Sequence, residues 1–249
     1  MGAQVGAAYA AGIPLDDVES LWRTSSVGRV ARTLCPTIPW SGWSSGREVT
    51  RTLDRLFGNR RIESFHIPFV AVATDLETGQ PVALHSGSAV SAIRASLSVP
   101  GLFTPVWLED RLLVDGGVSN PLPVDLVRSL DVDVVVAVDV LVEPSEVELG
   151  GIPAIPMRDL SLGIVRRIGS GPTDPRRYHP SVFSVLFQMS TVFQKRLCTL
   201  QLQSNPPDLL LRPDFRADPP CYSRVGCGIE AGERAMNAAM PALRDLLSR

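Results

Sequence analysis

The stretch Leu112-Leu-Val-Asp-Gly-Gly-Val-Ser-Asn-Pro-Leu-Pro123 governs how the rest of the chain is interpreted. A short apolar strand, Arg111 to Val114, leads directly into an acid, Asp115, and two glycines follow. Open α/β sheets place functional side chains at the carboxyl ends of their strands, and paired glycines allow a sharp turn. Asp-Gly is also common in ordinary turns. By itself, this stretch therefore predicts a turn rather than a site.

The segments around this stretch predict an α/β fold. Residues 67–74 and 132–140 are mostly apolar, which is typical of strands buried on both faces. Residues 88–96 and 123–130 have the pattern of helices. A strand, a helix and another strand in succession predict a largely parallel sheet between helix layers.

The C-terminal part of the chain is expected to be mainly helical. Residues 143–181 are rich in Pro and Gly and are expected to be irregular. Beyond them we expect a long helix over 182–203, a strand over 209–212 and a closing helix over 229–247. Without repeats or an evident linker, residues 1–249 are expected to form a single domain.

Composition excludes some classes of protein. The formal net charge of −2 gives no global basic field, so we expect no nucleic-acid partner. The four cysteines form no CxxC pair and the three histidines are scattered, so we expect reduced thiols and no metal site. The N-terminus lacks the basic region of a signal peptide, and no apolar run is long enough to span a bilayer. We expect a cytoplasmic protein and leave peripheral membrane contact open.

Further motifs flank the Asp115 turn in a fixed order. They are Phe69-Val-Ala-Val-Ala-Thr-Asp75-Leu-Glu-Thr-Gly79, Ala92-Ile-Arg-Ala-Ser96, Pro100-Gly-Leu-Phe103 and Asn120-Pro-Leu-Pro123. With this order and spacing the sequence resembles bacterial patatin-like phospholipases, best over residues 1–140. The resemblance returns within the C-terminal helical part, residues 182–249, in Asp208-Leu-Leu-Leu-Arg-Pro213 and Ile229-Glu-Ala-Gly-Glu233.

This resemblance implies both a fold and a chemistry. The fold would be a three-layer α/β/α patatin-like fold with a mostly parallel central sheet. The activity would be hydrolysis of acyl esters in phospholipid or lysophospholipid by a Ser–Asp dyad, with no metal or organic cofactor. Asp115 would be the base of the dyad, and Gly116 and Gly117 would shape the turn that holds it.

The serine nucleophile of the family lies in a Gly-x-Ser-x-Gly elbow between a strand and a helix. The helix after the elbow resembles Gly2-Ala-Gln-Val-Gly6-Ala-Ala-Tyr9, so Gly2 would be the last glycine of the elbow. The serine would then immediately precede Met1. We expect this chain to lack its nucleophile, the first strand or strands of its sheet and its oxyanion loop, and to be inactive as written. A misassigned start codon and a real truncation both remain open.

Two alternatives to a hydrolase stay open: a non-catalytic lipid- or partner-binding remnant, and an acyltransferase with the same dyad. A second Gly-x-Ser-x-Gly match, Gly42-Trp-Ser44-Ser-Gly46, is not preceded by a plausible buried strand. We expect Ser44 or Ser45 to cap the helix that begins near Arg47 instead.

Other polar and aromatic residues receive structural interpretations. Asp75 is expected in a turn, and a structural role is favoured for Asp139. Arg94 is read as a solvated helix residue or as a phosphate ligand. The aromatic residues of the long C-terminal helix are expected in the core rather than on a lipid-facing surface. These are Phe183, Phe187 and Phe193.

Overall fold

The computed structural model describes residues 2–23, 44–141, 182–214 and 225–248. The strands are β1 (Ala71–Asp75), β2 (Pro81–Leu84), β3 (Val106–Leu108), β4 (Arg111–Asp115), β5 (Val136–Val138) and β6 (Leu209–Leu211). The α-helices are α1 (Gly2–Ala10), α2 (Leu15–Arg23), α4 (Arg47–Phe57), α5 (Ala89–Ser96), α6 (Val124–Arg128), α7 (Val182–Ser204) and α8 (Val225–Leu247). Two short 3₁₀ helices, η1 (Ile62–Ser64) and η2 (Gly116–Val118), complete the set.

Four strands form one antiparallel sheet in the order β2-β1-β4-β3. In its register Ala73 of β1 pairs with Asp115 of β4. The β3–β4 hairpin turns through Glu109 and Asp110, which both have positive φ angles of 50° and 61°. Two residues with positive φ are typical of a tight hairpin turn whose twist matches that of its strands. This turn sets the register that brings Asp115 to the end of β4.

The second sheet is a parallel pair, β5 and β6, in which Val136 pairs with Leu209 and Val138 with Leu211. The structure confirms the α/β class. The directions of the described strands differ from the mostly parallel sheet expected from the sequence, since β1 pairs antiparallel with β2 and β4, and β3 with β4. Short turns join β1 to β2 and β3 to β4, and a short turn can join only antiparallel neighbours.

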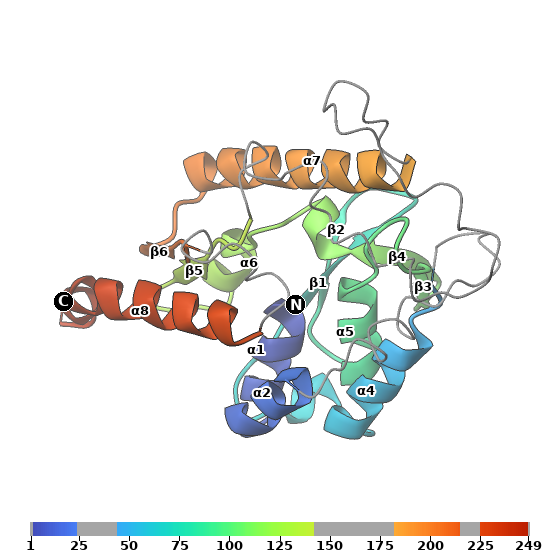
Figure 1. Cartoon of the computed structure of the whole chain (residues 1–249), viewed down its shortest axis with the longest axis horizontal. Helices are drawn as coiled ribbons and strands as arrows, with labels where there is room; N and C mark the ends of the chain where they lie inside the picture. The colour runs from blue at the N-terminus through green and yellow to red at the C-terminus, as the bar shows by residue number, and fades with distance from the viewer. Residues whose placement is uncertain (1, 24–43, 142–181, 215–224, 249) are drawn as a thin grey trace, which may run out of the picture.

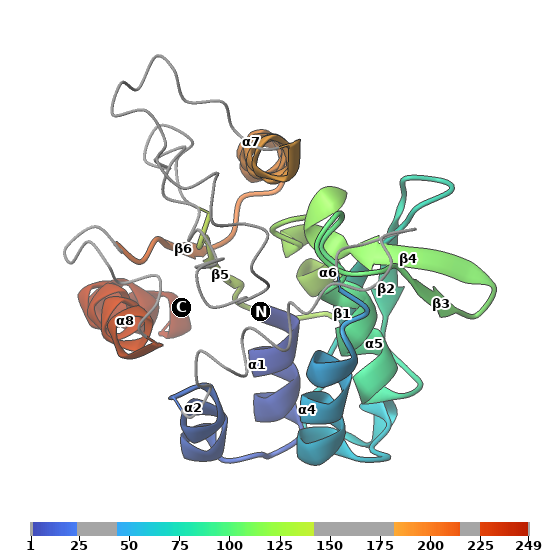
Figure 2. The same cartoon turned by 45° about the vertical axis from the view of Figure 1, so that its right-hand side comes forward.

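The larger core lies between helices α1, α4 and α5 and the sheet strands β1 and β4 (Figure 2). Its largest fully buried side chains include Phe57 and Leu53 of α4, Ile93 of α5 and Leu113 of β4. Ala7 and Ala8 present the small-residue face of α1 to this core. Close packing here fixes the helices against the sheet that carries Asp115.

The smaller core lies between α7, α6 and the β5–β6 pair and includes Cys198, Val124 and Val135. Helices α7 and α8 lie on opposite sides of β5 and β6 (Figure 1). From Val135, which precedes β5, to the end of the strand the burial alternates, with Val135 and Ala137 buried and Val136 and Val138 exposed. The prediction that this strand is buried on both faces was therefore wrong for the residues that the structure describes.

Most helix boundaries follow the expected signals. Gly12, with a φ of 71°, follows the end of α1, and the Ser88 side chain caps α5 by accepting from Ser91 N–H. The expected serine cap of α4 was wrong. Its N-cap is Gly46, which makes no side-chain capping bond. Among the described helices, none is long and apolar enough to cross a bilayer.

Candidate active site

Backbone contacts from two directions fix the position of Asp115. Its N–H donates to the carbonyl of Ser98 at 3.0 Å. Its own carbonyl accepts from the Thr74 hydroxyl at 2.8 Å. Asp115 therefore stays in register with β1 on one side and with the segment after α5 on the other.

A backbone donor two residues along the chain orients the Asp115 carboxylate. Oδ1 accepts a hydrogen bond from Gly117 N–H at 2.7 Å, and this bond opens η2. Among the described residues no other hydrogen bond to this carboxylate is present, and Oδ2 is left for another donor. Burial raises the pKa of Asp115, while the Gly117 N–H and the positive charge at the amino end of the chain oppose the rise. A buried, oriented carboxylate with a raised pKa suits a general base.

The two glycines after Asp115 are required for different reasons. A Cβ on Gly116 would lie 2.6 Å from the carbonyl carbon of Val72 and closer still to its oxygen. The turn therefore rests directly on the β1 backbone. A Cβ on Gly117 would lie 2.9 Å from Asp115 Oδ1 and 3.2 Å from the Gln194 side chain of α7. Gly116 lets the turn approach β1, and Gly117 leaves room for the carboxylate and for α7.

The hydroxyls of Thr74 and Ser119 form two consecutive hydrogen bonds beside the turn, which the sequence did not indicate. Thr74 Oγ1 donates to the Asp115 carbonyl, so the 2.8 Å contact between Thr74 and Ser119 has Ser119 as its donor. Thr74 is buried. Both residues lie in motifs noted in the sequence, but neither motif predicts this contact, because the β1–β4 register that brings them together exists only in the folded chain.

Asn120 connects the turn to helix α7. Its N–H donates to the Gly116 carbonyl at 2.8 Å, and its side-chain amide donates to Asp125. The Asn120 Oδ1 accepts from Gln201 of α7 at 2.8 Å. The buried Asn120 thereby ties the turn, α6 and α7 together.

Arg94 is buried, which contradicts the solvated alternative drawn from the sequence. Its guanidinium donates to Ser98 Oγ at 2.6 Å and to the carbonyls of Ser45 and Thr104, and it lies over the Phe103 ring. Burial lowers the pKa of Arg94. Because Ser98 also accepts from Asp115 N–H, Arg94 supports the backbone behind the acid.

The described part of the second Gly-x-Ser-x-Gly match, residues 44–46, packs beside the Arg94 side chain. Gly42 and Trp43 lie outside the described residues, but Ser44 is buried and pairs with Phe103 in an isolated parallel bridge. Gly46 has a φ of 67°, and a Cβ there would lie 2.6 Å from Arg94 Nε. Ser44 is therefore packed into a loop rather than presented at a strand-to-helix elbow.

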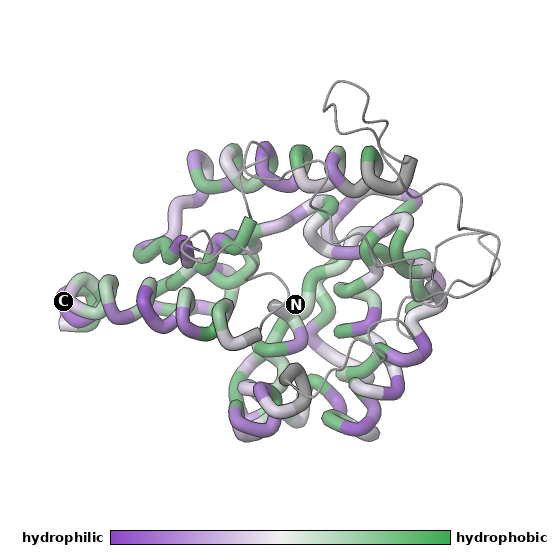
Figure 3. The backbone as a smooth tube through the Cα atoms, viewed as in Figure 1, coloured by the Kyte–Doolittle hydropathy of each residue, from purple (hydrophilic) through white to green (hydrophobic). Residues whose placement is uncertain are grey.

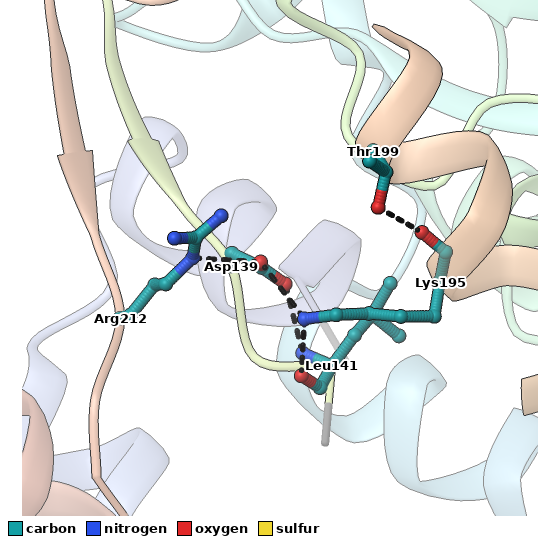
Figure 4. Close-up of polar contacts among 5 residues, drawn as sticks. All are labelled: Asp139, Leu141, Lys195, Thr199 and Arg212. Carbon is teal, nitrogen blue, oxygen red and sulfur yellow. Dashed lines mark hydrogen bonds and ion pairs between the residues drawn. The ribbon is translucent and has the colours of Figure 1, made fainter. Parts of the chain in front are cut away.

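Asp75 and Asp139 have structural contacts. Asp75 Oδ1 accepts from Glu77 N–H at 2.9 Å, and this bond lowers the pKa of Asp75. Asp139, immediately after β5, pairs with Lys195 of α7 at 3.4 Å and with Arg212 at 3.3 Å (Figure 4). The turn interpretation of Asp75 and the structural interpretation of Asp139 agree with these contacts.

The remaining predictions from the sequence concern Gly2, the aromatic residues of α7, the cysteines and a metal site. Gly2 is the first residue of α1, and a Cβ there would meet nothing within 4 Å. Phe193 is 58% exposed, so its predicted place in the core was wrong. The side chains of Phe183 and Phe187 lie outside the described part. Cys198 and Cys227 are free thiols, and Cys198 is buried. Within the described ranges, no group of three or more His, Cys, Asp or Glu side chains could hold a metal ion.

Comparisons with known proteins concern the same region. The family model for patatin-like phospholipases matches residues 1–128. An uncharacterized NTE family protein of Mycobacterium tuberculosis is 35% identical over 159 residues, which cover 64% of this chain and 41% of that protein. A second such protein of the same organism is 30% identical over 213 residues, 85% of this chain and 35% of its own length. Lysophospholipase NTE1 of Pyricularia oryzae is 34% identical over 145 residues, 56% of this chain and 10% of that protein. The chain thus spans less than half the length of the curated relatives that it matches.

Proposed function

Because this chain belongs to the patatin-like phospholipase family, we propose that it carries the catalytic base of a lipid acyl hydrolase acting on phospholipid or lysophospholipid. One relative bears the name lysophospholipase, which supports a lysolipid substrate. The observation that carries the proposal is the Asp115 carboxylate, buried at the end of β4 with one oxygen held by Gly117 N–H.

Asp115 acts with a serine hydroxyl as its partner. The serine oxygen attacks the acyl carbonyl carbon while its proton passes to Asp115 Oδ2. Collapse of the tetrahedral intermediate releases the lysolipid or glycerophospho alcohol, which takes the proton from Asp115. Water, deprotonated by the same carboxylate, then hydrolyses the acyl-serine to fatty acid and free serine. This dyad needs neither metal nor organic cofactor.

We place the nucleophile immediately before Met1. One observation supports that position. Helix α1 begins at Gly2 with the glycine and small residues that the family has after its elbow.

The test compares two aspartates in the chain extended upstream in frame. We expect hydrolysis of p-nitrophenyl butyrate, and a loss of about 10²-fold or more on Asp115→Asn, the scale of a lost general base. Asp75→Asn is the matched control, since Asp75 lies on the paired strand but binds only a neighbouring turn. We expect it to keep the activity.

Full activity in the Asp115 variant would refute the dyad. An upstream reading frame with no serine elbow, together with no hydrolysis, would favour a non-catalytic remnant. Analysis of the products with an added lysolipid or alcohol acceptor separates the two enzyme alternatives, because an acyltransferase moves the acyl group to the acceptor while a hydrolase releases fatty acid.

A further inference from the structure

Helix α7 has an apolar outer face. Five large apolar residues on it are between 39% and 58% exposed: Val185, Met189, Val192, Phe193 and Leu200. At roughly 100° per residue these positions fall within an arc of about 100°. Apolar residues recur along the length of the helix (Figure 3). We name these five residues the α7 apolar face.

The opposite side of α7 is fixed to the protein. Cys198 is buried in the smaller core, and Gln201 donates to Asn120. Lys195 reaches inward to Asp139 and to the Leu141 carbonyl (Figure 4). The direction of the apolar face is therefore set by contacts on the inner side, and the face cannot turn inward without breaking them.

The candidate active site lies against the inner side of α7. Gln194 follows Phe193 in the chain and lies against Gly117, which orients Asp115. At roughly 100° per residue, Gln194 lies about 150° from the centre of the apolar arc. Helix α7 therefore stands between the Asp115 turn on its inner side and the apolar face on its outer side.

The charge on α7 indicates the kind of surface. Its 23 residues contain two bases, Lys195 and Arg196, and no acid. Lys195 points toward the interior and forms an ion pair with Asp139. Arg196 lies exposed at the centre of the apolar arc. An apolar helix face with a basic centre suits an interface of acyl chains and anionic headgroups.

We infer that the α7 apolar face docks on an anionic lipid surface and so keeps the protein at the interface that contains its substrate. The choice of lipid as the occupant rests on the proposed function. The docking itself depends on the exposed residues and on Arg196, and it needs no catalysis.

The test measures binding of the 249-residue chain to vesicles of non-hydrolysable ether lipids, with anionic phosphatidylglycerol-type or neutral phosphatidylcholine-type headgroups. We expect preferential binding to the anionic vesicles. Phe193→Glu should weaken it at least about tenfold, since a large apolar side chain can no longer be buried. Arg196→Gln should weaken binding to anionic vesicles about fivefold and leave neutral vesicles unaffected.

Trp107→Ala is the matched control, because Trp107 is an exposed aromatic residue on β3, 66% accessible. Vesicle binding that is absent, unchanged by Phe193→Glu, or lost equally in Trp107→Ala would overturn the inference. So would a dimer in solution that Phe193→Glu dissociates, since a second copy would then be the occupant. Circular dichroism confirms that each variant is folded.

The proposed hydrolysis and the proposed lipid docking can be refuted independently of each other. In the upstream-extended chain, Asp115→Asn should abolish hydrolysis and keep vesicle binding. Phe193→Glu should lose vesicle binding and keep hydrolysis of the soluble ester.

Discussion

Substituting Gly116 by alanine tests the closest contact in the site. The new Cβ would lie 2.6 Å from the Val72 carbonyl carbon, and relief to an ordinary separation of about 3.5 Å requires a shift of about 1 Å. Val72 lies in β1, which is paired on both sides, so the strand resists that shift. We expect a cost near the upper end of overpacking, about 3 kcal/mol.

Gly232→Ala in α8 is the matched control. The same added methyl meets nothing within 4 Å there, and alanine is favoured over glycine in a helix by about 1 kcal/mol. Urea unfolding followed by circular dichroism should show opposite shifts of the midpoint. In thermal melts, at about 2–4 °C per kcal/mol, Gly116→Ala should fall by about 6–12 °C and Gly232→Ala should rise by a few degrees. A Gly116→Ala protein within about 0.5 kcal/mol of the wild type would refute the close approach of the turn to β1.

The further predictions concern ionised groups. Burial raises the pKa of Asp115, so the stability that its protonated form provides is present at acid pH and is lost as the pH rises through that raised pKa. The melting temperature of Asp115→Asn, measured relative to that of the wild type, should therefore rise between pH 4 and pH 8. If this difference in melting temperature stayed constant over that range, burial would not raise the pKa of Asp115. The extended enzyme should lose activity as the pH falls through the same pKa. Asp139→Asn leaves the nearly buried Lys195 without its carboxylate and should cost about 3–5 kcal/mol. Arg212→Gln, on an exposed side chain, should cost about 1 kcal/mol or less by urea unfolding. Because Asp139→Asn removes both pairs, a loss in Arg212→Gln as large as in Asp139→Asn would show that the Lys195 pair contributes nothing.

Local structure could be predicted from the sequence to a large extent. Local features depend on residues within a few positions of one another, so the sequence predicts them. Examples are the Asp115 turn, the helix that begins after Ser88 and the helix that ends before Gly12. The order of motifs around the turn also identified the family, and the match to residues 1–128 confirms it.

The rest depends on contacts between distant segments. Arg94 carries no sequence mark of burial, because its partners Ser45 and Thr104 reach it only in the folded chain. Phe193 has the same helical spacing as a core residue, and the pattern does not tell which side of α7 meets the protein. The antiparallel pairing of β1 with β4 is likewise set by a register across forty residues.

The donor that orients Asp115 is the backbone of Gly117, two residues along the same turn. In a triad a separate side chain positions the base and can be deleted by mutation. Here an alanine scan, which removes side chains, would leave the Gly117 N–H in place and would not measure how much the proposed base depends on it. Replacing the amide at position 117, by proline or by a backbone ester, would expose what such a scan cannot detect.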